Sequence, residues 1–284
     1  MALAYRILNV FTVAGDRLSG NPLCVFEDGR GLDDATMLAL ARQLNLSETT
    51  FILPAESPGA TARVRIFTPV FEMPFAGHPT LGTAHVVRDL TGSGDQVALE
   101  MKAGLVQVAA QGDRWTLRAV QAPETRAPEA SPDELAAMVG LPPGSVHQPL
   151  WVNTGADQLV LPLSTPAQVR AARPDAARLE RYGRSESMGE RMAYVWAPAG
   201  PGHVLARFFF LADGEVREDP ATGSACANLG GWHVATGAPR PLSLTVEQGE
   251  AVGRPSRLGL AVVESGAIFV SGDVVELGRG SLVL

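Results

Sequence analysis

The sequence predicts a mixed α/β protein built from two similar halves. Strand and helix patterns alternate along all 284 residues. A short motif of the form Glu-x-Pro-x-x-Gly-[His/Ser] occurs at Glu72–His78 and again at Glu218–Ser224, 146 residues later. Each copy follows a strand pattern and begins a helix of small, apolar residues. We therefore interpret the chain as two copies of one mixed strand-and-helix unit.

The first half, residues 1–120, contains two predicted helices. An apolar stripe at helical spacing predicts a helix over Asp33–Leu44, with Asp33 or Asp34 as its cap. The second helix, Pro79–Leu90, directly follows the first copy of the motif. β-branched and aromatic residues predict the strands around these helices. Those strands are Tyr5–Val13, Pro22–Glu27, Thr49–Leu53, Ala62–Phe67, Gln96–Leu99, Leu105–Ala109 and Trp115–Arg118.

The second half, residues 146–284, repeats this order after a connection. Residues 121–145 are rich in Pro, Ala and Glu and predict an inter-domain connection with one short helix that starts near Ser131. The helix after the second copy of the motif is predicted over Thr222–Ala235. The C-terminal strand is also able to pair with the first half. The strands predicted here include Gln158–Pro162, Met192–Trp196, Val204–Leu211, Leu242–Val246, Arg257–Glu264 and Asp273–Leu277.

Composition excludes several classes of function. Lys102 is the one lysine among 23 basic residues, and it lies in a predicted surface hairpin, which argues against Schiff-base or pyridoxal-phosphate chemistry. A net charge of −7 without a basic run argues against nucleic acid as a partner. No apolar run reaches the roughly 18 residues of a membrane span, and Cys24 and Cys226 form no metal-binding pattern. We expect a cytoplasmic protein that binds neither membrane nor metal.

The two copies of the motif are candidate anion-binding points. Each places the N-terminus of a helix, with its unpaired N–H groups and positive dipole end, directly after a turn. Such an end binds a carboxylate without a lysine. Gly77, Gly223 and Ser224 are therefore the candidate substrate-binding residues.

Three side chains near these points are suited to proton transfer. The ordinary pKa of the His78 imidazole lies near neutrality. Asp219 lies beside a helix N-terminus, which favours its ionised form. Glu48 lies between a helix and an apolar strand, where a carboxyl group favours its neutral form and can serve as a general acid or base. The alternative for Asp219 and Ser224 is that they only cap the second helix.

Five motifs in the same order resemble the phenazine-biosynthesis isomerase family, whose members are related in fold to diaminopimelate epimerase. The resemblance covers nearly the whole chain, and the second copy departs from it where Arg207 is followed by Phe-Phe-Phe-Leu-Ala without a proline. The motifs are GNPLCVF (Gly20–Phe26), NLSETTF (Asn45–Phe51), RIFTP with EMPFAGHPTLGTA (Arg65–Ala84), EDPATGSACANL (Glu218–Leu229) and QGEAVGRPS (Gln248–Ser256).

The resemblance implies two pseudo-symmetric halves, each a barrel-like mixed sheet around a central helix, with the site between them and a homodimer as the assembly. It implies that Glu48 is the catalytic acid and base, that His78 and Asp219 are catalytic partners, and that Gly77, Gly223 and Ser224 contact the substrate. No cofactor is implied. The expected activity is a proton shift within a small carboxylate-bearing metabolite, which is dihydro-3-hydroxyanthranilate in the best-known member.

Two other functions stay open from the sequence. A cofactor-independent epimerase or racemase uses two cysteines at symmetric places, whereas Cys24 and Cys226 are 202 residues apart and lie away from the helix N-termini. A small-anion binding protein needs the helix N-termini but no acid or base such as Glu48.

Overall fold

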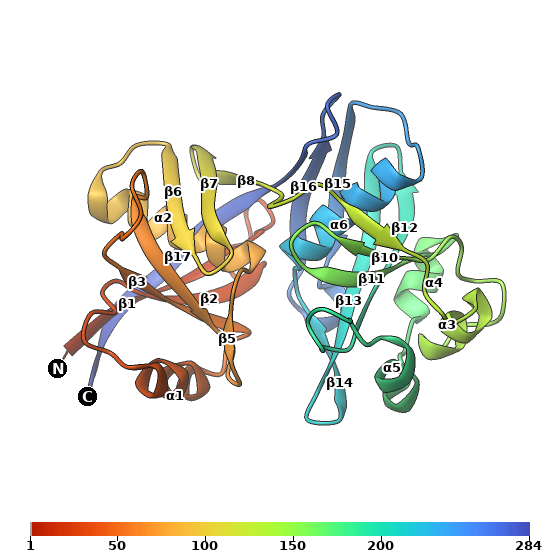
Figure 1. The fold of residues 1–284 in the computed structure, drawn as a ribbon, viewed down its shortest axis with the longest axis horizontal. Coiled ribbons are helices and arrows are strands. Elements are labelled where there is room, and N and C mark those ends of the chain that lie inside the picture. Colours follow the sequence, from red (N-terminus) through yellow and green to blue (C-terminus); the bar gives the residue numbers. More distant parts are fainter. Residues whose placement is uncertain (1) are drawn as a thin grey trace. The chain divides into compact units, whose positions relative to one another are not determined.

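The computed structural model describes residues 2–284, which divide into two compact units (Figure 1). The first unit consists of the chain up to Arg118 together with Ser271–Leu284, and the second unit is Ala119–Val270. No helix within residues 2–284 has the length and apolar character needed to cross a membrane.

The strands of the first unit form a closed ring. β1 pairs antiparallel with β2, and β2 continues through β3, β4, β6, β7 and β8 to β17, which pairs with β1. The β2–β3 and β4–β6 pairs are parallel. The two ends of the chain lie side by side, because Ala2 is opposite Val283 (Figure 1). The bounds are β1 Ala2–Val10, β2 Asn21–Phe26, β3 Glu48–Leu53, β4 Ala62–Phe67, β5 Glu72–Met73, β6 Gln96–Met101, β7 Gly104–Gln111, β8 Arg114–Arg118 and β17 Ile268–Val283.

Helix α2 (Gly77–Thr91) fills the inside of this ring. It contacts β1, β2, β3, β4, β6, β7 and β8 (Figure 1). A ring of this size leaves little space for side chains, and the first half of the helix carries small residues. A Cβ atom added to Gly82 would lie 2.5 Å from Leu23 Cδ2 and 3.0 Å from Val10 Cγ2. The small-residue pattern that follows the motif is therefore a packing requirement.

Helix α1 (Asp34–Leu44) packs on the outer side of the ring. Asp33 caps it by accepting a hydrogen bond from the Thr36 N–H at 2.8 Å. Its buried face joins a cluster that includes the stacked rings of Phe26 and Phe51, whose centroids are 4.9 Å apart. Asn45 ends the helix in the left-handed conformation, with φ 51°, and the chain then enters β3 at Glu48. Glu48 is thus held at the start of a buried strand.

The second unit repeats the pairing scheme of the first. Strands β10, β11, β12, β13, β15 and β16 pair in the same order and directions as β1, β2, β3, β4, β6 and β7, and α6 contacts β9, β10, β11 and β16. This shared topology is what a duplicated unit would have. The bounds are β9 Glu124–Arg126, β10 Leu150–Asn153, β11 Asp157–Pro162, β12 Met192–Gly200, β13 His203–Ala212, β14 Glu215–Asp219, β15 Leu242–Gln248, β16 Ser256–Val262, α6 Gly223–Ala235 and the 3-10 turn Glu250–Val252.

Three short helices cover the outer side of the second unit. They are α3 (Pro132–Met138), α4 (Pro166–Ala171) and α5 (Ala176–Tyr182). Leu135, Val169 and Leu179 from these helices are buried in one cluster with side chains of β11, β12 and β13. Residues 121–145, which include β9 and α3, therefore form part of this unit.

We predict that Gly82→Ala destabilises the protein although alanine is the better helix former. Alanine normally gains about 1 kcal/mol over glycine inside a helix, but overpacking a dense core costs about 1–3 kcal/mol. The 2.5 Å approach to Leu23 places this cost at about 2–3 kcal/mol. The expected net fall in the free energy of unfolding is therefore about 1–2 kcal/mol, measured by denaturant titration. Gly278→Ala in β17 is the control, because its added Cβ would meet no described heavy atom within 4 Å. Equal stability of the two variants would contradict the tight fit of α2.

Candidate active site

The predicted site residues fall into two groups, one in each unit. The first-unit cluster consists of Glu48, Gly77 and His78, and the second-unit cluster consists of Asp219, Gly223 and Ser224. In both clusters the glycine is the first residue of the central helix and the polar residue after it is the second.

Glu48 and His78 lie in direct contact in the first-unit cluster. The Glu48 Oε2 atom is 3.3 Å from Nε2 of His78, and both side chains are largely buried. The other ring nitrogen of His78 donates a hydrogen bond to the backbone of Pro22 in β2. Because proline has no N–H, its carbonyl oxygen is the acceptor, and the nitrogen bonded to it, Nδ1, must carry the proton.

This contact determines how the pair can hold a proton. Burial lowers the pKa of His78 from 6.5 to about 3, so the ring is neutral at pH 7 and its Nε2 is an acceptor. An acceptor nitrogen and a carboxylate oxygen repel each other at this distance, whereas a protonated carboxyl group can donate a hydrogen bond to the nitrogen. A proton taken up by Glu48 would therefore be stabilised beside the Nε2 acceptor, from which Oε2 is 3.3 Å away.

Salt bridges hold the turn that precedes α2. The Arg65 guanidinium binds both carboxylate oxygens of Glu72 at 2.7 Å each, and the Lys102 Nζ binds Glu72 Oε2 at 2.6 Å. The carbonyl oxygen of Pro74 accepts a hydrogen bond from the Ala103 N–H at 3.1 Å. Lys102 lies in the exposed turn between β6 and β7, as predicted, and its contact with Glu72 is structural.

The second unit repeats the arginine–glutamate pair. Arg207 binds both oxygens of Glu218 at 3.1 and 2.7 Å and also donates to the Ala172 carbonyl at 2.9 Å. The Arg207–Glu218 pair is present although the second copy of the motif lacks the proline that follows the arginine in the first copy. Neither arginine–glutamate pair was predicted from the sequence. The sequence feature that could have predicted both pairs is an arginine in the strand that precedes each motif glutamate.

Asp219 is held by Thr222 and by the C-terminal end of β15. Its Oδ2 atom accepts a hydrogen bond from the Thr222 hydroxyl at 2.5 Å. The buried Gln248 donates to the Asp219 carbonyl at 2.9 Å and to Thr222 Oγ1 at 3.0 Å. Gly249 has φ +81°, and a Cβ there would lie 2.5 Å from the Pro220 carbonyl oxygen. The Gln-Gly pair in the last motif therefore braces the turn that carries Asp219.

The N-termini of the two central helices lack a side-chain cap. The N-cap residues of α2 and α6 are Ala76 and Thr222, and neither side chain bonds the helix N-terminus among residues 2–284. By contrast, Asp33, Ser131, Thr165 and Asp175 cap α1, α3, α4 and α5. Uncapped N–H groups and the positive end of the dipole are suited to an anionic ligand.

Neither cysteine is arranged for thiol chemistry. Cys24 in β2 and Cys226 in α6 are fully buried. Burial raises the pKa of Cys24 to about 12 and that of Cys226 also above its usual value, so both thiols remain protonated at neutral pH. In the described part of the chain, no three His, Cys, Asp or Glu side chains gather in a way that could hold a metal ion.

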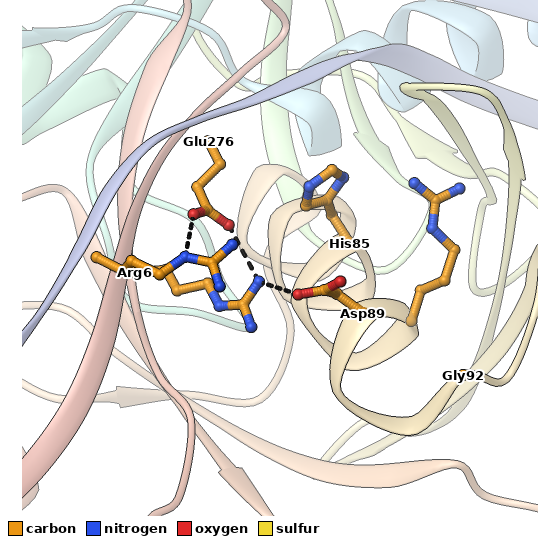
Figure 2. Close-up of a pocket in the computed structure, with 7 residues that line it drawn as sticks. Arg6, His85, Asp89, Gly92 and Glu276 are labelled. Atoms are coloured by element: carbon orange, nitrogen blue, oxygen red, sulfur yellow. Dashed lines mark hydrogen bonds and ion pairs between the residues drawn. The ribbon is translucent and has the colours of Figure 1, made fainter.

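A cavity of about 570 Å³ at the C-terminal end of α2 is separate from these clusters (Figure 2). Its buried Arg6 binds Glu27 at 2.6 Å, Asp89 at 2.5 Å and Glu276 at 3.0 Å. Because Arg6 pairs with three carboxylates and these contacts join β1, α2 and β17, we interpret them as a structural network. The cavity is lined by Arg6, His85, Arg88, Asp89, Gly92, Glu276 and Arg279.

Comparison with known proteins identifies the family. The family described as phenazine biosynthesis-like protein matches residues 8–280. The chain belongs to this family. An uncharacterized isomerase of Pasteurella multocida is 35% identical over 279 residues, which cover 98% of this chain and 93% of the relative. The trans-2,3-dihydro-3-hydroxyanthranilate isomerase of Pseudomonas aeruginosa is 35% identical over 289 residues, which cover 99% of each chain.

A solved structure supports the same conclusion about the fold. The Bacillus anthracis phenazine biosynthesis protein of the PhzF family superimposes with a TM-score of 0.85 over 100% of both chains at 23% identity. This confirms the predicted α/β fold, and the family match confirms the predicted family. Because both of these relatives are isomerases, the chain is an isomerase.

We predict that His78 is a neutral ring protonated at Nδ1 from pH 8 down to pH 5. The pKa of about 3 that follows from burial lies well below this range, and the Pro22 carbonyl selects the tautomer. Nitrogen-15 NMR of histidine-labelled protein measures both ring nitrogens, and His78→Gln assigns the signal. A proton on Nε2, or titration of the ring between pH 5 and 8, would show that the contact with Glu48 is of another kind.

Proposed function

We propose that the protein catalyses a proton shift within a small carboxylate-bearing metabolite, with Glu48 as both acid and base and without a cofactor. The observation that carries this proposal is the 3.3 Å contact between Glu48 Oε2 and His78 Nε2. It joins a carboxyl group to a buried acceptor at the start of α2, where no side chain caps the helix among the described residues. Proton transfer by one positioned group suits an isomerase, because the reaction needs no net oxidant, reductant or water.

In the proposed reaction, Glu48 takes a proton from a carbon next to an electron-withdrawing group. Its partly exposed carboxyl exchanges that proton with solvent and then delivers a proton to another carbon of the same molecule. After the first step Glu48 is a carboxylic acid, and Nε2 of His78 stabilises that form by accepting its hydrogen bond. The electron pair left on the substrate is delocalised toward the second carbon, which receives the proton. General acid–base transfer of this kind contributes about 10²- to 10⁴-fold to the rate.

The second-unit cluster is proposed to bind the substrate. The N-terminus of α6 at Gly223 and the Ser224 hydroxyl would hold the carboxylate, and Gly77 offers the same kind of helix end in the first unit. Asp219, braced by Gln248 and Thr222, would orient a donor group of the substrate such as an amine or hydroxyl. The Pseudomonas aeruginosa relative acts, by its name, on trans-2,3-dihydro-3-hydroxyanthranilate. This compound is a cyclic, unsaturated carboxylate and the first substrate to test.

The two-thiol mechanism of an epimerase has little support, because burial keeps Cys24 and Cys226 protonated. A small-anion binding protein would not need the Glu48–His78 contact. A variant of Glu48 therefore distinguishes the proposed isomerase from a binding protein.

We predict that Glu48→Gln lowers turnover of trans-2,3-dihydro-3-hydroxyanthranilate by about 10²- to 10⁴-fold and changes its affinity less than threefold. The amide keeps the shape of the side chain and can still donate to Nε2, but it cannot carry a proton to and from carbon. Turnover is followed by chromatography and affinity by calorimetry.

Glu56→Gln, an exposed substitution in the same unit, is the matched control and should keep full activity. Glu48→Asp should retain a small part of the turnover because its carboxyl is withdrawn from the substrate by one methylene. Full turnover by Glu48→Gln would refute the mechanism.

A further inference from the structure

Ser224 lies at the end of a chain of hydrogen bonds between buried amides of the second unit. Its Oγ atom is 2.9 Å from Gln158 Nε2, and Gln158 Oε1 is 2.8 Å from Asn228 Nδ2. Asn228 Oδ1 is in turn 2.9 Å from the Thr154 N and 2.6 Å from its hydroxyl. Thr154, Gln158 and Asn228 are all buried, so water cannot replace these bonds.

Two backbone groups set the direction of every bond in this chain. The Thr154 N–H can only donate, so the atom of Asn228 that faces it must be the amide oxygen. The Ala156 carbonyl can only accept, and Asn228 Nδ2 donates to it at 2.8 Å. The second N–H of that amide therefore points at the oxygen of Gln158. This in turn leaves the NH₂ group of Gln158 to donate to Ser224.

The direction of the chain decides what Ser224 can offer a ligand. Because Oγ accepts from Gln158, the single hydroxyl proton of Ser224 is directed to another acceptor. Ser224 is the second residue of α6, whose N-cap Thr222 makes no side-chain cap. A donor hydroxyl beside a positive helix end matches an anionic oxygen and does not match an ammonium group.

We propose that Gln158 and Asn228 are positioning residues that hold the Ser224 hydroxyl as a hydrogen-bond donor for a carboxylate. This inference rests on the proposed function, in which the second-unit cluster binds the substrate. It adds that the cluster selects the charge and the acceptor character of its ligand through two amides that do not touch that ligand.

The experiment compares the binding of anthranilate and anthranilamide by calorimetry. The two probes differ by one group, a carboxylate against a neutral carboxamide. The wild-type protein should bind anthranilate more tightly. Ser224→Ala and Gln158→Met should each weaken anthranilate binding about tenfold, the size expected for one hydrogen bond to a charged group, and should change anthranilamide binding much less. Gln96→Met, an exposed substitution in β6, is the control and should change neither affinity.

The double variant tests whether Gln158 acts through Ser224. If it does, Gln158→Met has no further effect on anthranilate binding once Ser224 is alanine. Equal losses in both backgrounds, or equal losses for both probes, would overturn the positioning role even if Glu48→Gln abolishes turnover. Failure of the wild-type protein to bind anthranilate at millimolar concentration would overturn the ligand class, while the turnover of Glu48→Gln would still decide the proposed function.

A second variant keeps the test decisive if Gln158→Met does not fold. Gln158→Glu retains the shape of the side chain but presents an acceptor to Ser224, which then donates to it and turns a lone pair toward the ligand. Anthranilate binding should fall at least tenfold. Unchanged affinity in Gln158→Glu would contradict the inference.

Discussion

The enclosure of one helix inside each unit is the constraint on which the other features depend. In the first unit the ring of strands accepts α2 only because residues such as Gly82 are small, and α6 carries glycines in equally crowded places. A helix enclosed in this way cannot present functional side chains along its length, so the residues available for chemistry are those at its N-terminus. The arginine–glutamate pairs Arg65–Glu72 and Arg207–Glu218 fix the turns that lead to those residues.

The second residue of the central helix has opposite hydrogen-bonding roles in the two units. In the first unit the Pro22 carbonyl accepts from the His78 ring and leaves an acceptor nitrogen facing Glu48. In the second unit the Gln158 amide donates to Ser224 and leaves a hydroxyl donor. The same fold therefore presents a proton acceptor, His78, in the first unit and a hydrogen-bond donor for an anion, Ser224, in the second. The difference comes from one partner in each unit, Pro22 on β2 and Gln158 on the corresponding strand β11.

The sequence predicted the repeated unit and the identity of the site residues, because turns and helix starts are encoded locally by glycine, proline and small residues. It identified Glu48 and His78 separately, and their contact required the pairing of β2 with β3 around α2. Gln158, Asn228 and Gln248 were missed as partners because a buried amide looks like any polar residue until its neighbours are known. The same holds for Arg65 and Arg207, which meet their glutamates only across strand pairs.

The most direct test of the account is deuterium incorporation during turnover in D₂O without added cofactor. Wild-type protein should place solvent deuterium at the receiving carbon of trans-2,3-dihydro-3-hydroxyanthranilate or of another cyclic or unsaturated carboxylate, detected by mass spectrometry. Glu48→Gln should place none, because its amide cannot exchange a proton between solvent and carbon. Incorporation at the wild-type rate by Glu48→Gln, or none by the wild-type protein with any such carboxylate, would contradict the assignment of Glu48 as the acid and base.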